Sequence, residues 1–113
     1  MERDCVFCKI INGEIKGDVV YENEDIIAIR DIAPQAPHHY LIIPKVHIPT
    51  SQDVKDPSLW GNLMSAVNVV AERMGLADLG YRVVINCGSQ ACQSIFHLHI
   101  HLLSGRRFGW PPG

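Results

Sequence analysis

Between Phe96 and Leu102, large apolar residues alternate strictly with three histidines, His97, His99 and His101. Side chains on a β-strand point alternately to its two faces, so this period of two predicts a strand with one buried apolar face. The histidines would share the other face at a spacing of about 6–7 Å, which leaves the outer two about 13 Å apart and too distant to share one ion. Three imidazoles on one rigid face suit proton transfer or nucleophilic chemistry near neutral pH. The alternative is a surface strand whose outer face happens to carry histidine.

The other elements follow from hydrophobic periodicity and from turn residues. Strands are predicted over Asp18–Glu22, Asp25–Arg30, His39–Ile43 and Tyr81–Asn86, and a short helix over Val6–Ile11. Asp56-Pro57 is a typical helix start, and the helix is expected to end at Gly75. Its apolar residues recur every three or four positions and predict a stripe that covers one face of the sheet: Leu59, Trp60, Leu63, Met64, Val67, Val70, Ala71 and Met74.

Composition narrows the class of protein. A chain of 113 residues, 47% of them hydrophobic, is expected to form a single domain over residues 1–113. Its formal net charge of -2 argues against binding a nucleic acid polymer, although a small nucleotide could still use local donors. No apolar run is long enough for a membrane span, and the charged start does not resemble a secretory signal. We therefore expect a cytoplasmic location, with the nucleus as the alternative, where the four cysteines serve as thiols or metal ligands.

Two further stretches carry candidate chemistry. Cys5 and Cys8 form a Cys-x-x-Cys pair, which suits metal binding or redox chemistry, or is simply two buried thiols; the redox interpretation lacks a thioredoxin-like βαβ context. Small residues from Cys87 to Ser94 would let backbone N–H groups approach an anion closely, although this loop matches no established phosphate-binding motif.

Histidine can attack phosphorus and form a covalent intermediate, and the central His99 is the natural nucleophile because its neighbours can orient it. Ser94 offers a hydroxyl that could pass a proton to a departing group. Asp31 and Asn86 stand at strand ends, where they could bind a sugar, orient an imidazole or cap a turn. The last residues, 110–113, read Trp-Pro-Pro-Gly and are either a frayed end or an arm that packs on another subunit.

Taken together, these residues resemble the histidine triad (HIT) family, and within it the Hint branch of nucleoside phosphoramidases. The motif is His-apolar-His-apolar-His-apolar-apolar over residues 97–103. The accompanying segments are the Asp-Ile-Ala-Pro-Gln-Ala-Pro run at 31–37, His39, Ile43-Pro44-Lys45, Asn86, Gln93-Ser94 and the Trp-Pro-Pro-Gly end. The resemblance runs from about Cys5 to the end of the chain.

The resemblance implies hydrolysis of a purine nucleoside phosphoramidate, such as an AMP–amine, through a covalent nucleotidyl intermediate on His99. His101 and His97 would support His99 and contact phosphate, His39 would orient the cluster, and Ser94 would assist the leaving amine. Asp31 would hold the ribose. The remaining residues that the resemblance implicates line the purine pocket (Val6, Phe7, Ile10, Ile15, Ile29 and Ile32) or hold the phosphate (Asn86, Gly88, Cys92 and Gln93).

The resemblance also implies an architecture: an α+β fold with a five-stranded antiparallel sheet, one long and one short helix, and a ten-stranded sheet across a homodimer. The tail over residues 104–113 would then bring Trp110 to the partner's active site. Some members bind zinc through Cys-x-x-Cys and two histidines, which corresponds to Cys5, Cys8, His47 and His97, a set suited to a closed structural site. Where this branch has glycine in the phosphate loop, the chain has Cys92.

Three alternatives stay open at this point. His97 and His99 could be a catalytic zinc pair that activates water, but the motif supplies neither a third ligand nor a carboxylate base. The enzyme could instead hydrolyse dinucleoside polyphosphates, or cleave acyl or sulfate groups from AMP. A nucleotide-binding scaffold protein would keep the pocket without turnover.

Overall fold

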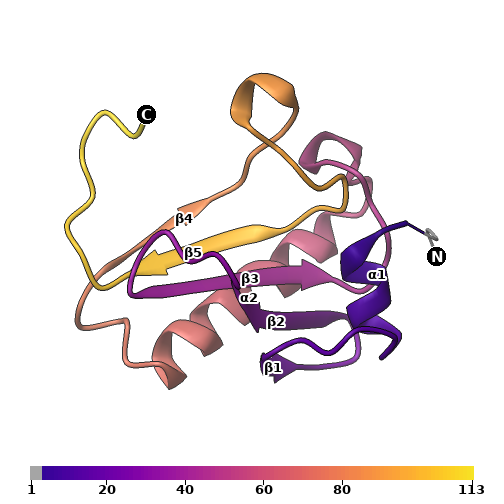
Figure 1. Ribbon diagram of the computed structural model, residues 1–113, viewed down its shortest axis with the longest axis horizontal. Coiled ribbons are helices and arrows are strands. Elements are labelled where there is room, and N and C mark those ends of the chain that lie inside the picture. The colour runs from indigo at the N-terminus through magenta and orange to yellow at the C-terminus, as the bar shows by residue number, and fades with distance from the viewer. Residues whose placement is uncertain (1–3) are drawn as a thin grey trace.

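One antiparallel sheet of five strands forms the centre of the protein (Figure 1). The computed structural model describes residues 4–113. The strands lie in the order β1-β2-β3-β5-β4. Their bounds are β1 Val19–Glu22, β2 Ile26–Arg30, β3 His38–Pro44, β4 Tyr81–Val84 and β5 Ile100–Ser104. The predicted α+β fold, with five strands, one short and one long helix, is confirmed.

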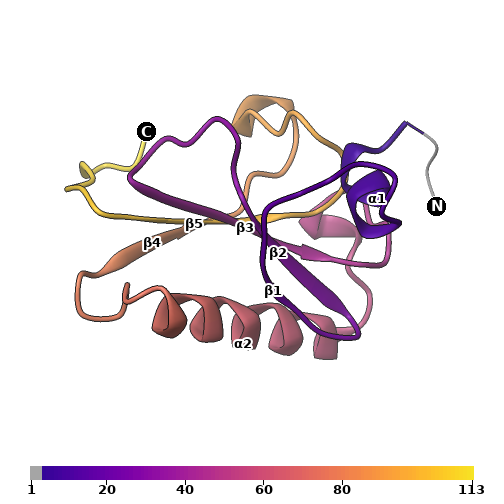
Figure 2. The same cartoon turned by 60° about the horizontal axis from the view of Figure 1, so that its bottom comes forward.

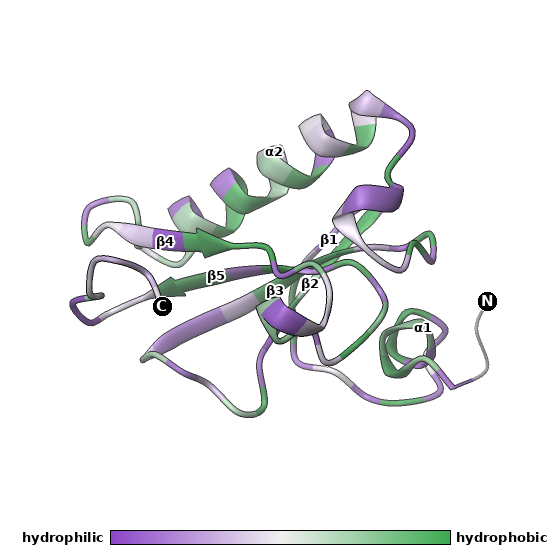
Figure 3. Cartoon of the chain, turned by 90° about the horizontal axis from the view of Figure 1, so that it is seen from above, coloured by the Kyte–Doolittle hydropathy of each residue, from purple (hydrophilic) through white to green (hydrophobic). Residues whose placement is uncertain are grey.

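The long helix α2, Pro57–Arg73, covers one face of the sheet (Figure 2). The Asp56 side chain accepts the Ser58 backbone N–H at 2.9 Å, which fixes the predicted start. Its hydrophobic side turns toward the sheet and its hydrophilic side away (Figure 3). Most of the predicted stripe is buried, but Met64 is 40% exposed, so its assignment to the core was wrong, and Ala66 is buried in addition.

The short helix α1, Val6–Ile11, lies on the opposite face of the sheet (Figure 2). Alternation along β2 divides the residues between the two cores, because Ile26 and Ala28 pack toward α2 while Ile27 and Ile29 pack with Phe7 of α1. Along β3 the residues that share the α1 face are His39, Leu41 and Ile43. The α1 face is therefore the one that carries histidines.

The histidine strand is shorter than predicted. β5 begins only at Ile100, and Leu98 donates its N–H to the Ile48 carbonyl outside the sheet at 2.7 Å. Pro44, which has no N–H, lies where the ladder between β3 and β5 would continue. Alternation persists beyond the ladder, since Leu98 and Ile100 are buried under α2, but Phe96 is 52% exposed and does not belong to the apolar face.

Two further features bear on the site. The prediction placed Asn86 at the last position of the fourth strand. The strand β4 ends at Val84, so Asn86 lies beyond it. By sheet order β4 is an edge strand, next to β5 alone. None of the helices in residues 4–113 has the length and apolarity that a membrane span requires.

Candidate active site and metal cluster

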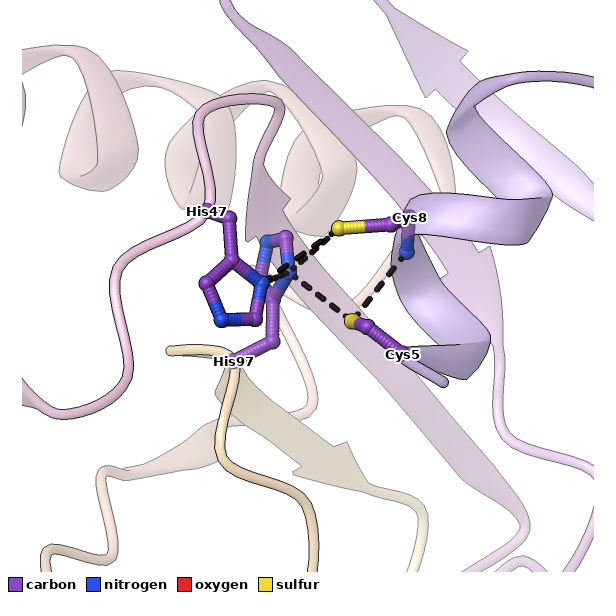
Figure 4. A group of neighbouring side chains, drawn as sticks. All are labelled: Cys5, Cys8, His47 and His97. Atoms are coloured by element: carbon purple, nitrogen blue, oxygen red, sulfur yellow. Dashed lines mark hydrogen bonds between the residues drawn. The ribbon is translucent and has the colours of Figure 1, made fainter. Parts of the chain in front are cut away.

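Two side-chain clusters occupy the α1 face, and the first contains the four predicted metal ligands (Figure 4). Cys5 caps α1, Cys8 lies one turn later, His47 follows β3, and His97 precedes β5. Their ligand atoms all lie within 4.8 Å of one another. The two His Nδ1 atoms are 3.1 Å apart, and each thiol lies 3.3 Å from one of them.

These distances fit a tetrahedral zinc site. Zinc bonds of about 2.3 Å to sulfur and about 2.0 Å to nitrogen give tetrahedron edges of about 3.3 Å between nitrogens and about 3.5 Å between nitrogen and sulfur. The Nε2–H of His97 donates to the Pro44 carbonyl at 2.8 Å, which leaves Nδ1 unprotonated toward the cluster. Burial lowers the pKa of His97, which also favours the neutral ring that a metal requires. The cluster could therefore bind zinc through four protein ligands, with no open position.

The second cluster contains the other histidines of the motif. His99 donates its Nδ1–H to the His97 carbonyl at 2.8 Å, because a carbonyl can only accept, and this assigns Nε2 as the unprotonated nitrogen. Its ring lies 5.0 Å from that of His101 and 5.1 Å from Phe7, measured between centroids. His97 and His99 therefore do not converge on a shared ion, and the catalytic zinc pair that was left open is not formed.

His39 and His101 form a hydrogen-bonded pair with Asp31 beside it. The Gln35 N–H donates to His39 Nδ1 at 3.0 Å, so the proton of the neutral ring is on Nε2, from which it is donated to His101 Nδ1 at 2.9 Å. His101 then carries its own proton on Nε2. Burial, followed by the nearby His99 and His39 rings, lowers the pKa of His101 to about 4. Burial also lowers the pKa of His39, against the opposing charge of Asp31, which lies 3.4 Å away.

The same tautomer argument excludes a metal from the Asp31–His39–His101 group, although its ligand atoms are close together. A metal on His39 Nε2 would require the proton on Nδ1, where the Gln35 N–H already points. The group is better described as a relay of hydrogen bonds.

A cavity of about 360 Å³ opens beside this relay and collects most of the predicted substrate-binding residues. It is lined by the predicted Val6, Phe7, Ile10, Ile29, Asp31, Ile32, His39, Ser94, His99 and His101. Ile32 lines it from a fully open position, at 99% exposure. The lining thus combines apolar side chains with imidazoles, a carboxylate and a hydroxyl.

Other predicted site residues lie elsewhere. His97 is fully buried with the thiols, so its ring does not reach the cavity to contact phosphate. Ile15 is 40% exposed, and neither it nor Asn86 lines the cavity. Trp110, at 83% exposure, extends from the tail. Its assignment to a partner's active site concerns a second subunit.

The loop that was expected to bind phosphate uses its own donors. Gly88 N–H donates to the Gln93 side-chain oxygen at 2.9 Å, Gln93 N–H to the Gly88 carbonyl, and Cys92 N–H to the Ser89 carbonyl. The Gln93 side-chain amide donates to the Pro49 and Ile95 carbonyls. These residues shape the loop, and Ser94 is the member that lines the cavity.

Sequence reasoning missed five residues that line the cavity, of which two are Arg30 and Ala33. Leu41 lines the cavity and lies opposite His101 in the sheet; its two-residue spacing from His39 was the available signal. Ile95 also lines the cavity. Gln35 acts through its backbone N–H, for which no side-chain pattern gives a signal.

Comparisons with known proteins agree with this geometry. Residues 12–108 match the HIT domain family. A maize (Zea mays) protein named "14 kDa zinc-binding protein" is 50% identical over 112 residues, covering 96% of this chain and 87% of its own length. An Arabidopsis thaliana protein named "Adenylylsulfatase HINT1" is 44% identical, covering 96% of this chain and 76% of its own length.

The fold is also found among solved structures. A HIT family hydrolase from Legionella pneumophila superposes with a TM-score of 0.94 at 49% identity, covering 97% of this chain and all of that one.

Proposed function

The chain belongs to the HIT domain family, and we propose that it hydrolyses purine nucleoside phosphoramidates, such as AMP–amine conjugates, through a nucleotidyl intermediate on His99. The observation that carries this proposal is the hydrogen bond from His99 Nδ1–H to the His97 carbonyl. It leaves Nε2 unprotonated on a ring that lines the cavity, which is the state a nucleophilic imidazole needs.

The reaction would proceed in two displacements. The His99 Nε2 lone pair forms a bond to phosphorus as the bond from phosphorus to the leaving nitrogen breaks, and the leaving nitrogen takes up a proton relayed by the Ser94 hydroxyl. The His97 carbonyl, which accepts Nδ1–H, stabilises the positive charge that develops on the ring. Water then attacks phosphorus, and its oxygen bonds to phosphorus as the nitrogen–phosphorus bond breaks. The proton that this water loses returns to the Ser94 relay and replaces the one given to the leaving nitrogen, so that the nucleotide is released and neutral His99 is restored.

The rest of the cavity would bind the nucleotide. We assign the purine to the apolar lining residues Val6, Phe7, Ile10 and Ile29, and the ribose hydroxyls to Asp31. His101 carries its proton on Nε2, and this N–H would donate a hydrogen bond to a phosphate oxygen.

The leaving group is open to a second candidate. The Arabidopsis relative is named an adenylylsulfatase, and an adenylyl sulfate would present the same AMP half to His99 with sulfate in place of the amine. Acyl-AMP and dinucleoside polyphosphates are further alternatives for the same attack on phosphorus.

We propose further that two chains pair their β4 edges into a ten-stranded sheet, and that the 104–113 tail brings Trp110 to the partner's site. An edge strand offers unpaired N–H and C=O groups, and a tryptophan that is 83% exposed is suited to a contact. Sedimentation should give twice the 12.6 kDa chain mass. Thiolate ligands for zinc favour a reducing location, the cytoplasm or nucleus.

The decisive experiment is intact mass after a rapid quench with an adenosine phosphoramidate, on the wild-type protein and on His99→Ala. We expect a transient adduct of one AMP in the wild-type protein, no adduct and no turnover in the variant, and AMP binding by calorimetry in both. Turnover by His99→Ala would exclude the covalent route. Binding without turnover in the wild-type protein would favour a nucleotide-binding scaffold protein. Parallel assays with adenylyl sulfate and acyl-AMP would rank the leaving groups.

A further inference from the structure

The C-terminal tail is fastened to its own subunit by two arginines. The Arg106 guanidinium lies 4.2 Å from the centroid of the Phe108 ring, and that of Arg82 on β4 lies 5.2 Å from the same ring. Arg82 Nη2–H also donates to the Gly109 carbonyl at 2.9 Å. Charged donors and cation–π contacts thus hold residues 106–109 against the Arg82 side chain of β4.

Arg106 also connects the tail to the loop before β3. Its Nε–H donates to the Gln35 carbonyl at 3.0 Å. Gln35 is the residue whose N–H donates to His39 Nδ1, and His39 in turn donates to His101. A continuous path of hydrogen bonds therefore runs from Arg106 through one backbone residue to the imidazole pair.

The tail and the loop before β3 pass close to each other at Gly105. Gly105 has φ +98°, and a Cβ placed on it would lie 2.9 Å from Pro37 Cβ and 3.2 Å from His38 Cδ2. Only glycine allows both that backbone conformation and that approach. The tail therefore leaves β5 pressed against the end of the loop that holds Gln35.

We propose that Arg106 is a positioning residue for the histidine relay, and this inference rests on the proposed function. By holding the Gln35 carbonyl, Arg106 limits rotation of the Gln35 backbone and keeps its N–H aimed at His39 Nδ1. That donor fixes His39 in the Nε2–H tautomer, which in turn fixes His101 with its proton on Nε2, toward substrate phosphate. Arg106 touches no reacting atom and acts through Gln35 alone.

The test reads the tautomers directly. Long-range ¹H–¹⁵N spectra distinguish protonated from unprotonated ring nitrogens, so His39 in the wild-type protein should show a single Nε2–H tautomer. Arg106→Ala should give a mixture of tautomers at His39 and His101. Arg106→Lys keeps the charge but not the planar fork, and it should restore the wild-type spectrum in part. The matched control is Arg107→Ala, which removes an adjacent, exposed arginine and should leave the spectrum unchanged.

Kinetics provide the second readout. For Arg106→Ala we expect kcat to fall about 10-fold, with KM changed by less than about twofold. The purine and ribose contacts stay in place, while the His101 hydrogen bond to phosphate, which strengthens as charge develops in the transition state, is misplaced. A wild-type tautomer at His39 together with unchanged kcat in Arg106→Ala would overturn the inference. The spectra do not depend on turnover, so failure of the proposed function would appear separately, as a wild-type protein with an ordered relay and no hydrolysis.

Discussion

The Nδ1–H of His99 donates to the backbone carbonyl of His97 at 2.8 Å, so the residue that orients the proposed nucleophile is itself a member of the metal cluster. The imidazole of His97 faces the thiols, while its carbonyl faces the His99 ring. Any change that releases the His97 ring should therefore also loosen His99.

Removing one metal ligand should thus affect both stability and activity. Cys8→Ser should lower bound zinc from about one ion per chain to less than about 0.2, and lower Tm by at least about 5 °C. Turnover should fall by about 2- to 10-fold, because His99 stays in place but is held less firmly. Elemental analysis, calorimetry and the phosphoramidate assay measure these effects. Cys87→Ser, which removes an exposed thiol outside the cluster, is the control; equal zinc loss in it would refute the assignment.

Stability should depend on pH through His101. Its pKa is lowered to about 4 in the folded protein from an ordinary value of 6.5. Between these values the unfolded chain binds a proton that the folded chain does not, so the free energy of unfolding should decrease as pH falls from 6.5 toward 4. The lowered pKa of His39 acts in the same direction. Denaturant titrations at several pH values give the free energy of unfolding, and its change with pH should be smaller for His101→Gln than for the wild-type protein. Carboxylate protonation and metal release affect both proteins and cancel in the comparison.

Asp31 should discriminate ribose. Asp31→Asn is expected to raise KM for an adenosine phosphoramidate about 10- to 100-fold, the usual value of a hydrogen bond to a charged group. The substrate that lacks the 2′- and 3′-hydroxyls is the control, since its KM should be the same in both proteins. Because Asp31 also lies 3.4 Å from His39, kcat is expected to fall for both substrates. An equal rise of KM for both would show that Asp31 does not bind the sugar.

Cys92 has φ +63°, a left-handed conformation that glycine adopts without a steric cost. Cys92→Gly should relieve that cost, about 1 kcal/mol, against a similar loss from the more flexible unfolded chain, so stability should change by less than about 0.5 kcal/mol. The Cys92 N–H already bonds within the loop and its side chain does not line the cavity, so KM should stay within about twofold of the wild-type value. Cys92→Ala keeps a Cβ at the same left-handed position and is the control. A fall of KM in Cys92→Gly alone would show that the loop backbone does contact phosphate.

The sequence predicts what depends on local pattern. Alternation at residues 96–102 placed His99 and His101 on the face opposite α2, and Asp56-Pro57 located the start of α2. The pattern could not show that sheet pairing stops at Ile100, because that limit comes from Pro44 on a strand more than 50 residues away. The same alternation continues through His97, so the pattern alone did not distinguish His97 from the other two histidines. Its role as a metal ligand was predicted only by the family resemblance.

Backbone chemistry explains most of what was missed. The loop at 87–94 has the small residues of an anion-binding loop, yet the N–H groups of Gly88, Cys92 and Gln93 bond within the loop. Gln35 contributes a donor that every residue except proline possesses, so its role depends on where the backbone lies. Side-chain type, together with the family resemblance, predicted the four metal candidates, which the structure brings together. It also proposed His99, His101, His39 and Ser94 for catalysis, and these four line one cavity.

The metal cluster joins segments that are far apart in the chain, since Cys5 and His97 are separated by 92 positions. A zinc ion bound to both would close a ring comprising most of the molecule. Restricting an unfolded chain of that span removes conformational entropy worth about 4–5 kcal/mol in the loop-closure description. A disulfide of equal span would be opened by the thiols of a reducing compartment, whereas zinc–thiolate bonds form there. With zinc bound, the four ligands would thus supply the long-range cross-link that secreted domains obtain by oxidation.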